Sequence, residues 1–162
     1  MVLVSRARRR LLCLAAAASA TGPFAALARA VVLTVRSPSG AEHDFDMPAL
    51  ERLPQRDIVT ATPWYDRSRR FTGPLLRDVL AAAGARGAQL RAVALNDYEV
   101  NIPMSDARDY DVIVARLLDR QPLPRRDKGP LFIIYPFDEQ AELRTQVYFT
   151  RCAWQLRHIV VS

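Results

Sequence analysis

Two threonines and a tryptophan lie at the end of one expected strand and form the first group with binding chemistry. Thr60, Thr62 and Trp64 alternate along the run from Ile58 to Tyr65. Because alternate residues of a strand point to the same face, both hydroxyls can meet one ligand beside the indole ring. The alternative is structural, since threonine is a good strand former and Trp64 can be an anchor of the core. We take these three residues as ligand-binding candidates.

Arginines follow this group at once, as Arg67, Arg69 and Arg70. A guanidinium group binds a phosphate or another oxyanion through two parallel hydrogen bonds. Arg67 and Arg70 are therefore candidates for holding an anionic part of a ligand. A solvated loop is the alternative, because the chain has 23 basic residues in total.

Asp97 and Tyr98 follow Asn96 at an expected turn, where a carboxylate can accept hydrogen bonds from a ligand amine. Tyr135 ends an apolar run and is expected to line the same mouth as the earlier candidates. Turn formation and side-chain packing are the alternatives for these residues. We name no catalytic residue, because the serines and the two histidines lack a nucleophile or metal-ligand motif.

The hydrophobic pattern predicts the elements that must position these residues. Expected strands cover 31–35, 42–46, 56–62, 90–95, 98–103, 112–118, 131–135 and 154–161. Expected helices cover 48–53, 73–83 and one turn from Ser105 to Tyr110, while 139–149 is either helical or irregular. The wholly apolar run 131–135 is the best candidate for a central strand. Strands outnumber helices, which favours an α+β fold with mixed, mostly antiparallel sheets.

The first thirty residues are typical of a cleavable signal peptide. Arginines precede an apolar run from Leu11 to about Ala20, and Ala28-Arg29-Ala30 fits the small-x-small pattern of a cleavage site. The apolar run is shorter than the roughly 20 residues that span a bilayer, which disfavours a membrane anchor. The segment Arg8–Leu12 also fits a loose twin-arginine signal, so the export route stays open. We expect residues 1–30 to be removed and a periplasmic domain over 31–162 that does not insert into a membrane.

Composition excludes several classes of function for that domain. The formal charge of +6 falls to +1 once the leader, with five arginines and no acid, is removed. A nearly neutral domain has no electrostatic case for binding nucleic acid. Cys152 is then the single cysteine, which excludes an internal disulfide and a Cys-x-x-Cys metal site. We expect Cys152 to be a buried apolar residue.

Four motifs in order resemble the oxidoreductase molybdopterin-binding domain family, which has the sulfite oxidase fold. They are Phe71-Thr72-Gly73-Pro74-Leu75-Leu76-Arg77-Asp78-Val79-Leu80, then Asn96-Asp97-Tyr98 with Ile102-Pro103, then Asp119-Arg120-Gln121-Pro122-Leu123 with Gly129-Pro130-Leu131, and last the segment 154–161. The resemblance covers nearly all of 31–162. It implies a molybdopterin-binding fold and, in the enzymes of the family, a cysteine at a strand end that binds the metal.

This chain departs from that pattern at the strand end, where Thr60 and Thr62 stand and no cysteine does. A hydroxyl is a poor ligand for a metal that soft, charged sulfur holds in this setting. The chain therefore resembles short exported members of the family that lack the cysteine. We hypothesise a non-catalytic, sensory or accessory domain that binds a small ligand or a membrane-bound protein partner, with no cofactor expected. The alternative is a molybdopterin-dependent oxidoreductase or a subunit of one.

Overall fold

A computed structural model describes residues 30–162 of the chain. The expected signal peptide therefore lies outside the described residues, apart from Ala30. Within the described part, one hydrophobic core connects three small β-sheets. No helix of residues 30–162 has the length and hydropathy needed to cross a membrane.

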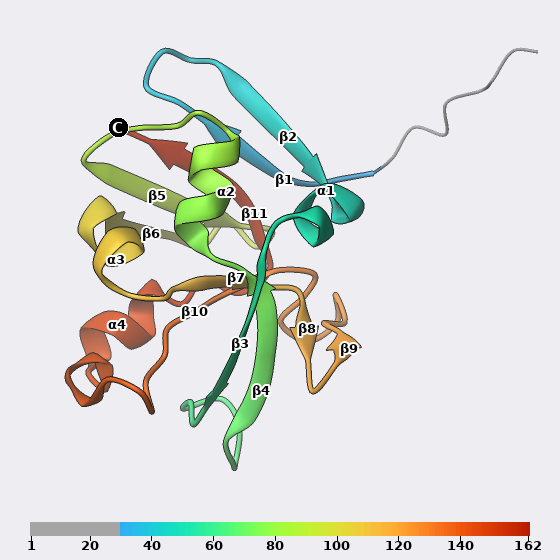
Figure 1. Cartoon of the computed structure of the whole chain (residues 1–162), viewed down its shortest axis with the longest axis vertical. Helices are drawn as coiled ribbons and strands as arrows, with labels where there is room; N and C mark the ends of the chain where they lie inside the picture. The colour runs from blue at the N-terminus through green and yellow to red at the C-terminus, as the bar shows by residue number, and fades with distance from the viewer. Residues whose placement is uncertain (1–29) are drawn as a thin grey trace, which may run out of the picture.

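The largest sheet has five strands in the order β2-β1-β11-β5-β6 (Figure 1). β1 and β11 pair in parallel, and the other neighbours pair antiparallel. These strands are β1 (Val31–Arg36), β2 (Glu42–Asp46), β5 (Gln89–Ala94), β6 (Glu99–Pro103) and β11 (Leu156–Val161). All five strands were predicted from the sequence. In the structure buried and exposed residues alternate along them, which gives a sheet with one buried face.

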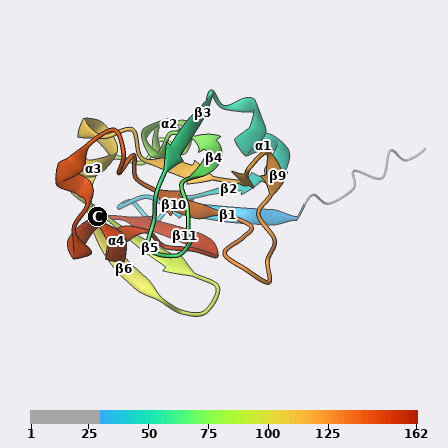
Figure 2. The same cartoon turned by 90° about the horizontal axis from the view of Figure 1, so that it is seen from below.

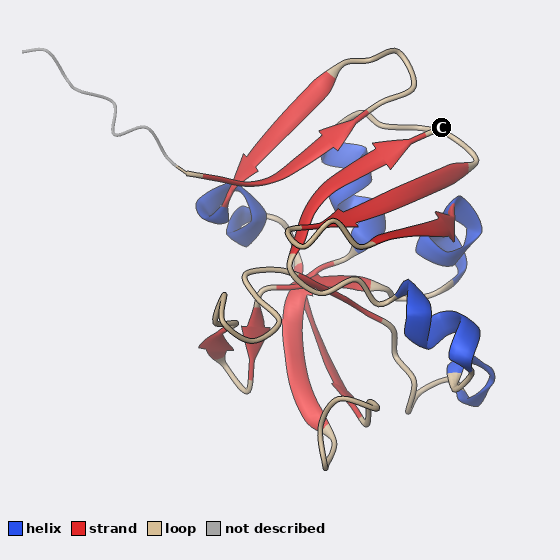
Figure 3. Cartoon of the chain, turned by 180° about the vertical axis from the view of Figure 1, so that it is seen from behind, coloured by secondary structure: helices blue, strands red, loops and turns tan. Residues whose placement is uncertain are grey.

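That alternation decides which face of the sheet the helices cover. Leu33 and Val35 are buried on one side of β1, while Thr34 between them is partly exposed. The helices α2 (Leu76–Ala82) and α3 (Met104–Asp109) pack on the buried side, and the view from behind shows the strands in front of them (Figure 3). The short helix α1 (Met47–Arg52) begins after Asp46, whose carboxylate accepts the Ala49 N–H at 2.7 Å.

A long hairpin leaves this body and forms part of the second sheet, which has the order β3-β4-β8-β9. Its strands are β3 (Gln55–Thr60), β4 (Arg69–Pro74), β8 (Leu117–Leu118) and β9 (Gln121–Pro122). The prediction of a helix from Gly73 is wrong at its start, because Gly73 lies in β4. A Cβ atom on Gly73 would stand 2.0 Å from the Val114 carbonyl oxygen, so this strand passes closer to its neighbour than a side chain allows.

The third sheet consists of β7 (Ile113–Ala115) and β10 (Phe132–Ile134). The expected strand 112–118 is therefore divided between β7 and β8. The run 131–135 is fully buried, but it was wrongly expected to be a central strand, since β10 pairs with β7 alone apart from an isolated bridge to Trp154. A 3₁₀ turn (Ala141–Leu143) and α4 (Gln146–Arg151) follow, and α4 lies beside β6 (Figure 2). The α+β class with mixed sheets is confirmed.

Candidate functional site

An aromatic cavity of about 210 Å³ lies between α4, the loop after β3 and the β5–β6 turn. We call it the Trp64 cavity. Among residues 30–162 no charged side chain lines it, and aromatic rings supply half of the lining positions. Its lining residues are Pro63, Trp64, Tyr98, Gln146, Phe149, Thr150, Cys152 and Trp154.

Perpendicular ring contacts hold the walls of the Trp64 cavity in place. Trp64 stands at 83° to Trp154, with the ring centroids 5.7 Å apart, and at 84° to Phe149, at 6.4 Å. Phe132 of β10 contacts both tryptophans from the core side. Edge-to-face pairs of this kind contribute beyond their buried area. The indole ring of Trp64 is therefore fixed by the core before any ligand arrives.

Tyr98 is the exposed aromatic residue of the Trp64 cavity, with 41% of the residue accessible to solvent. The Tyr98 hydroxyl donates to the Thr150 carbonyl oxygen at 2.7 Å, which ties the β5–β6 turn to α4. Partial burial raises the pKa of Tyr98, so its hydroxyl stays neutral at ordinary pH.

Cys152 follows the end of α4 and lines the same cavity, with 2% of the residue exposed. Its thiol contacts the Tyr148 carbonyl oxygen at 3.5 Å. Burial raises the pKa of Cys152 far above its usual range, which keeps the sulfur neutral and unreactive. The expectation of a buried apolar cysteine is confirmed.

A second, more open hollow of about 410 Å³ shares Pro63 and Phe149 with the Trp64 cavity. Thr62 lines this hollow, and its hydroxyl is buried without a hydrogen-bond partner in the described part of the chain. A buried hydroxyl without a partner costs about 1–3 kcal/mol. A polar ligand atom or a water molecule at this point would recover that free energy.

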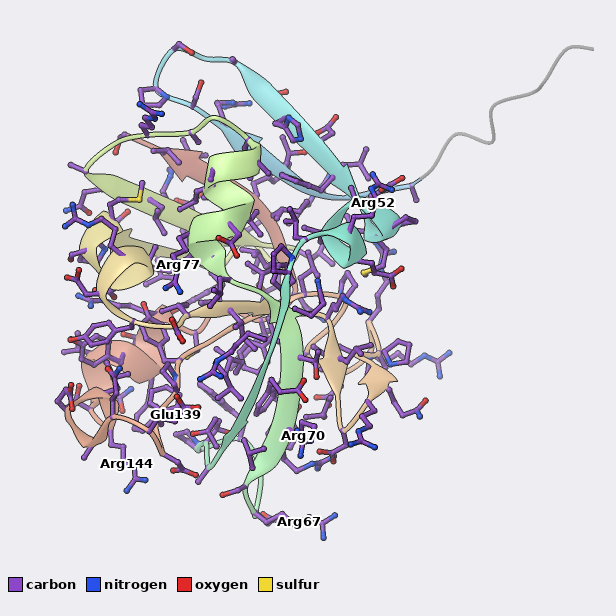
Figure 4. All side chains as sticks on the ribbon, viewed as in Figure 1. Arg52, Arg67, Arg70, Arg77, Glu139 and Arg144 are labelled. Carbon is purple, nitrogen blue, oxygen red and sulfur yellow. The ribbon has the colours of Figure 1, made fainter. Side chains whose placement is uncertain are left out.

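Asp138 organises the rim of this hollow. Its carboxylate accepts the Ala61 N–H at 2.8 Å, the Ser68 hydroxyl at 3.2 Å and the Arg144 guanidinium at 2.7 Å. Arg144 projects from the segment before α4, away from the sheets (Figure 4). The carboxylate is therefore already occupied by donors of this chain, which leaves the Thr62 hydroxyl as the group that can respond to a ligand.

Thr60 has a structural partner instead of an open side. It is fully buried, and its hydroxyl accepts the Asp138 N–H at 3.1 Å. This bond joins the end of β3 to the segment after β10. The two threonine hydroxyls, which were expected to share one face, therefore differ in their hydrogen bonding. The Thr60 hydroxyl binds a backbone N–H, and the Thr62 hydroxyl has no partner in the described residues.

The other predicted site residues lie away from the Trp64 cavity. Arg67 is exposed at the tip of the β3–β4 hairpin (Figure 4). The Arg70 guanidinium donates to Asp57 across that hairpin at 2.8 Å. Asp97 is exposed with a φ of 62°, in the left-handed region that Asp tolerates in turns. Arg67 lines a separate surface hollow together with Trp64, and none of these three residues lines the Trp64 cavity.

Tyr135 is not at a cavity mouth, which corrects the expectation from its position after an apolar run. It is fully buried, and its hydroxyl donates to the Asp106 carboxylate at 2.7 Å. Burial beside this carboxylate raises the pKa of Tyr135. Its polar end is satisfied inside the protein, so it is part of the core.

The sequence analysis did not predict the lining residues that come from the C-terminal part of the chain. Gln146, Phe149, Thr150, Cys152 and Trp154 all line the cavity. The one local pattern among them is an aromatic residue on either side of Cys152. This pattern does not predict a contact with Trp64, which lies more than eighty residues earlier in the chain.

The match to known proteins agrees with this architecture. A family model described as the oxidoreductase molybdopterin-binding domain matches residues 28–141. The chain belongs to this family. Among solved structures it is similar to the sulfane dehydrogenase SoxCD from Paracoccus pantotrophus, with a TM-score of 0.58 and 17% identity over 80% of this chain. At that identity the likeness shows the fold alone, and the chain spans 37% of the length of the SoxCD chain.

No curated protein sequence has a significant match to the chain. The family match ends at residue 141, before α4 begins. The residues of α4, Cys152 and Trp154 therefore line the Trp64 cavity from outside the matched region. The fold and family expectations are confirmed, and the role of this member is a separate question.

The residues at the strand end do not fit the cofactor that the family name implies. Thr60 offers a hydroxyl that already accepts the Asp138 N–H, and Cys152 offers a neutral thiol held in an apolar wall. The Trp64 cavity is also smaller than the roughly 300 Å³ at which ligand sites for drug-sized molecules usually begin. The described residues place no charged side chain in its wall to meet a phosphate group. We derive no chemistry through a metal for this chain.

Proposed function

We propose that this family member is a non-catalytic domain that is exported to the periplasm and binds a small ligand. The signal-peptide pattern of the first thirty residues supports export, and the family scaffold supports a binding role. The ligand-bound and ligand-free forms then present different surfaces to a membrane-bound protein partner. In this view the domain is a sensory or accessory component.

One observation carries this proposal. The enzymes of the family have a metal-binding thiolate at a strand end. At the end of β3 in this chain, Thr60 is buried and its hydroxyl accepts the backbone N–H of Asp138. An engaged, neutral hydroxyl does not replace a charged sulfur as a metal ligand. In this proposal the domain has the family fold but lacks the group that anchors the metal.

The ligand site in this proposal is the Trp64 cavity together with the adjoining hollow at Thr62. The cavity supplies preformed apolar walls, and the unpartnered Thr62 hydroxyl supplies a polar contact beside them. An apolar pocket with a few polar groups is the usual form of a small-molecule site. Trp64 and Tyr98 are the predicted site residues that meet there, and Thr62 is their neighbour.

The test is metal analysis of the protein purified from the periplasm of its native cells. We expect less than a tenth of an equivalent of molybdenum and no visible absorption band. A molybdenum-loaded enzyme of the same family, prepared in parallel, shows that the procedure retains the metal. Stoichiometric molybdenum in this protein would overturn the proposal.

The second candidate function is a molybdopterin-dependent oxidoreductase or a subunit of one. Its supporting observation is that Cys152, remote in sequence, lies in the same cavity as Trp64 beside the strand end. Metal content of the Cys152→Ser variant distinguishes the two functions. The enzyme hypothesis requires molybdenum in the natural protein and its loss in the variant, whereas the binding-domain proposal requires its absence from both.

A further inference from the structure

We propose that the Trp64 cavity binds a quaternary ammonium group, a cation whose nitrogen carries four carbon substituents. This inference rests on the proposed binding function and specifies its ligand. Four aromatic residues, Trp64, Tyr98, Phe149 and Trp154, line one small cavity. Aromatic rings carry negative charge on their faces, and clusters of them bind quaternary ammonium groups.

The arrangement of the rings suits this use. Trp64 is perpendicular to both Trp154 and Phe149, so the walls face in different directions. Tryptophan is the strongest of the aromatic side chains in cation–π contacts. Contacts with Phe132 hold both tryptophans from behind, which means that little ordering is needed when a ligand binds.

Two partly buried tyrosines elsewhere in the described residues already have a cation of their own. Arg69 and Lys128 lie over the Tyr65 ring at 5.1 Å and 4.8 Å, and Arg151 lies over the Tyr148 ring at 5.0 Å. Within residues 30–162, no cationic side chain lies over the rings that line the Trp64 cavity. The chain has 23 basic residues, yet none of those in the described part occupies this aromatic cavity.

The size of the cavity favours a small head group. Its volume of about 210 Å³ compares with about 150 Å³ for a protein cavity that holds benzene. A trimethylammonium group with a short arm needs a space of that order. Tyr98 of the lining is 41% exposed, so the cavity reaches the surface and the arm can extend to solvent.

The lining also distinguishes a quaternary ammonium from a primary one. No carboxylate of the described residues lines the cavity, so a primary ammonium would find only the neutral oxygens of Tyr98, Gln146 and Thr150 as side-chain acceptors. A primary ammonium has three N–H donors and is strongly hydrated, so it loses more on entering such a site. A nitrogen surrounded by methyl groups has no donor to satisfy. The cavity therefore selects charge without hydrogen bonds.

The experiment compares choline with its neutral carbon isostere, 3,3-dimethylbutan-1-ol. The two molecules have the same shape and differ in the charge of the central atom. The chain has two tryptophans and both line the cavity, so intrinsic fluorescence reports directly on occupancy. We expect saturable binding of choline and at least tenfold weaker binding of the isostere, with sodium chloride matched in both titrations.

Variants locate the site. Tyr98→Leu keeps an apolar side chain but removes a ring from the cavity lining, and we expect choline affinity to fall at least fivefold. Tyr98→Phe keeps the ring and restores most of that affinity. Tyr65→Leu is the matched control, because Tyr65 follows Trp64 in the chain but does not line the cavity. We expect the control to bind choline as the natural protein does.

The outcomes separate this inference from the function beneath it. Equal or tighter binding of the neutral isostere shows an apolar site and overturns the ammonium inference, while the binding-domain proposal stands. A protein that binds neither probe also overturns the ammonium inference. The binding-domain proposal itself fails on a different measurement, the stoichiometric molybdenum described above. Choline affinity unchanged by Tyr98→Leu would place any binding outside the cavity and refute the assignment.

Discussion

The two faces of α4 are built on different principles. On one face, Tyr148 and Arg151 enter a buried cluster whose polar groups are paired with one another. On the other face, Phe149 and Thr150 line the Trp64 cavity, where the contacts are apolar and the space is open. The hydrogen bonds on the cluster face hold α4 in position, and a ligand in the cavity does not contact them. The position of the cavity wall therefore depends on residues outside the cavity.

Asp106 is the centre of that buried cluster. It is 4% exposed, and its carboxylate accepts the Tyr135 hydroxyl at 2.7 Å and the Arg151 guanidinium at 2.8 Å. Arg151 also lies over the Tyr148 ring. These contacts join α3, the segment after β10 and α4. A satisfied buried network of this kind rigidifies the elements that it connects.

Removing the centre of the cluster has the largest expected effect. Asp106→Ala leaves the Arg151 guanidinium unpaired in a mostly buried position, and we expect the free energy of unfolding to fall by about 3–5 kcal/mol. Urea unfolding monitored by circular dichroism measures this change. Asp109→Ala, at an exposed position of the same helix, is the control. A loss of less than about 1 kcal/mol, the level of an exposed ion pair, would mean that the cluster does not hold α4.

Removing one donor has a smaller effect. Tyr135→Phe deletes the hydroxyl that donates to Asp106 but keeps the buried ring, and we expect a loss of about 1.5–3 kcal/mol, typical of a hydrogen bond to a charged group. Tyr148→Phe is the comparison, because its hydroxyl makes one long contact of 3.4 Å with Tyr110. The place of Asp106 as the centre of this face is contradicted if the Tyr148 variant is the less stable one.

A change on the cavity face should cost less again. Tyr98→Phe removes the hydroxyl that donates to Thr150 at a partly exposed position, for which we expect about 0.5–1.5 kcal/mol. The same unfolding assay applies. A loss as large as that of Asp106→Ala would show that the cavity face, and not the cluster, positions α4.

Acid should act on the exposed side of the hairpin, with the smallest effect of the series. The Thr72 hydroxyl bound to Asp57 lowers the pKa of that carboxyl, and the Arg70 N–H bound to Asp119 lowers the pKa of Asp119. A folded pKa below the unfolded value of 3.8 stabilises the protein above pH 3.8, and this contribution is lost as the pH falls below it. Acid unfolding of Asp57→Asn should therefore depend less steeply on pH below 3.8. An unchanged slope would remove Asp57 from the acid-sensitive groups.

Alternation predicts the five-stranded sheet because its pairing is reflected in local hydrophobicity. It fails for β4, where Gly73 and Pro74 are typical of a helix start. Glycine is needed at position 73 because a Cβ atom there would lie 2.0 Å from the Val114 carbonyl oxygen. No local sequence pattern shows that contact. The helical spacing of Leu76, Val79 and Leu80 correctly predicted α2, which begins two residues after the strand ends.

The candidate site was predictable in part for the same reason. Trp64 and Tyr98 follow strand ends, which is a local signal, whereas Phe149, Cys152 and Trp154 reach the cavity through tertiary folding. Tyr135 follows an apolar strand too, but Asp106 gives its hydroxyl a partner in the interior. The sequence shows which side chains have groups that can bind a ligand. The fold decides whether another residue of the protein already binds those groups.

The place of β11 between β1 and β5 sets the order in which the molecule can assemble. Thr34 of the first strand pairs with His158 of the last, so the middle of the sheet is missing until the ribosome has made almost all of these residues. Pairing over such a separation closes slowly. A partly synthesised chain therefore stays open, with β1 and β5 lacking a common neighbour.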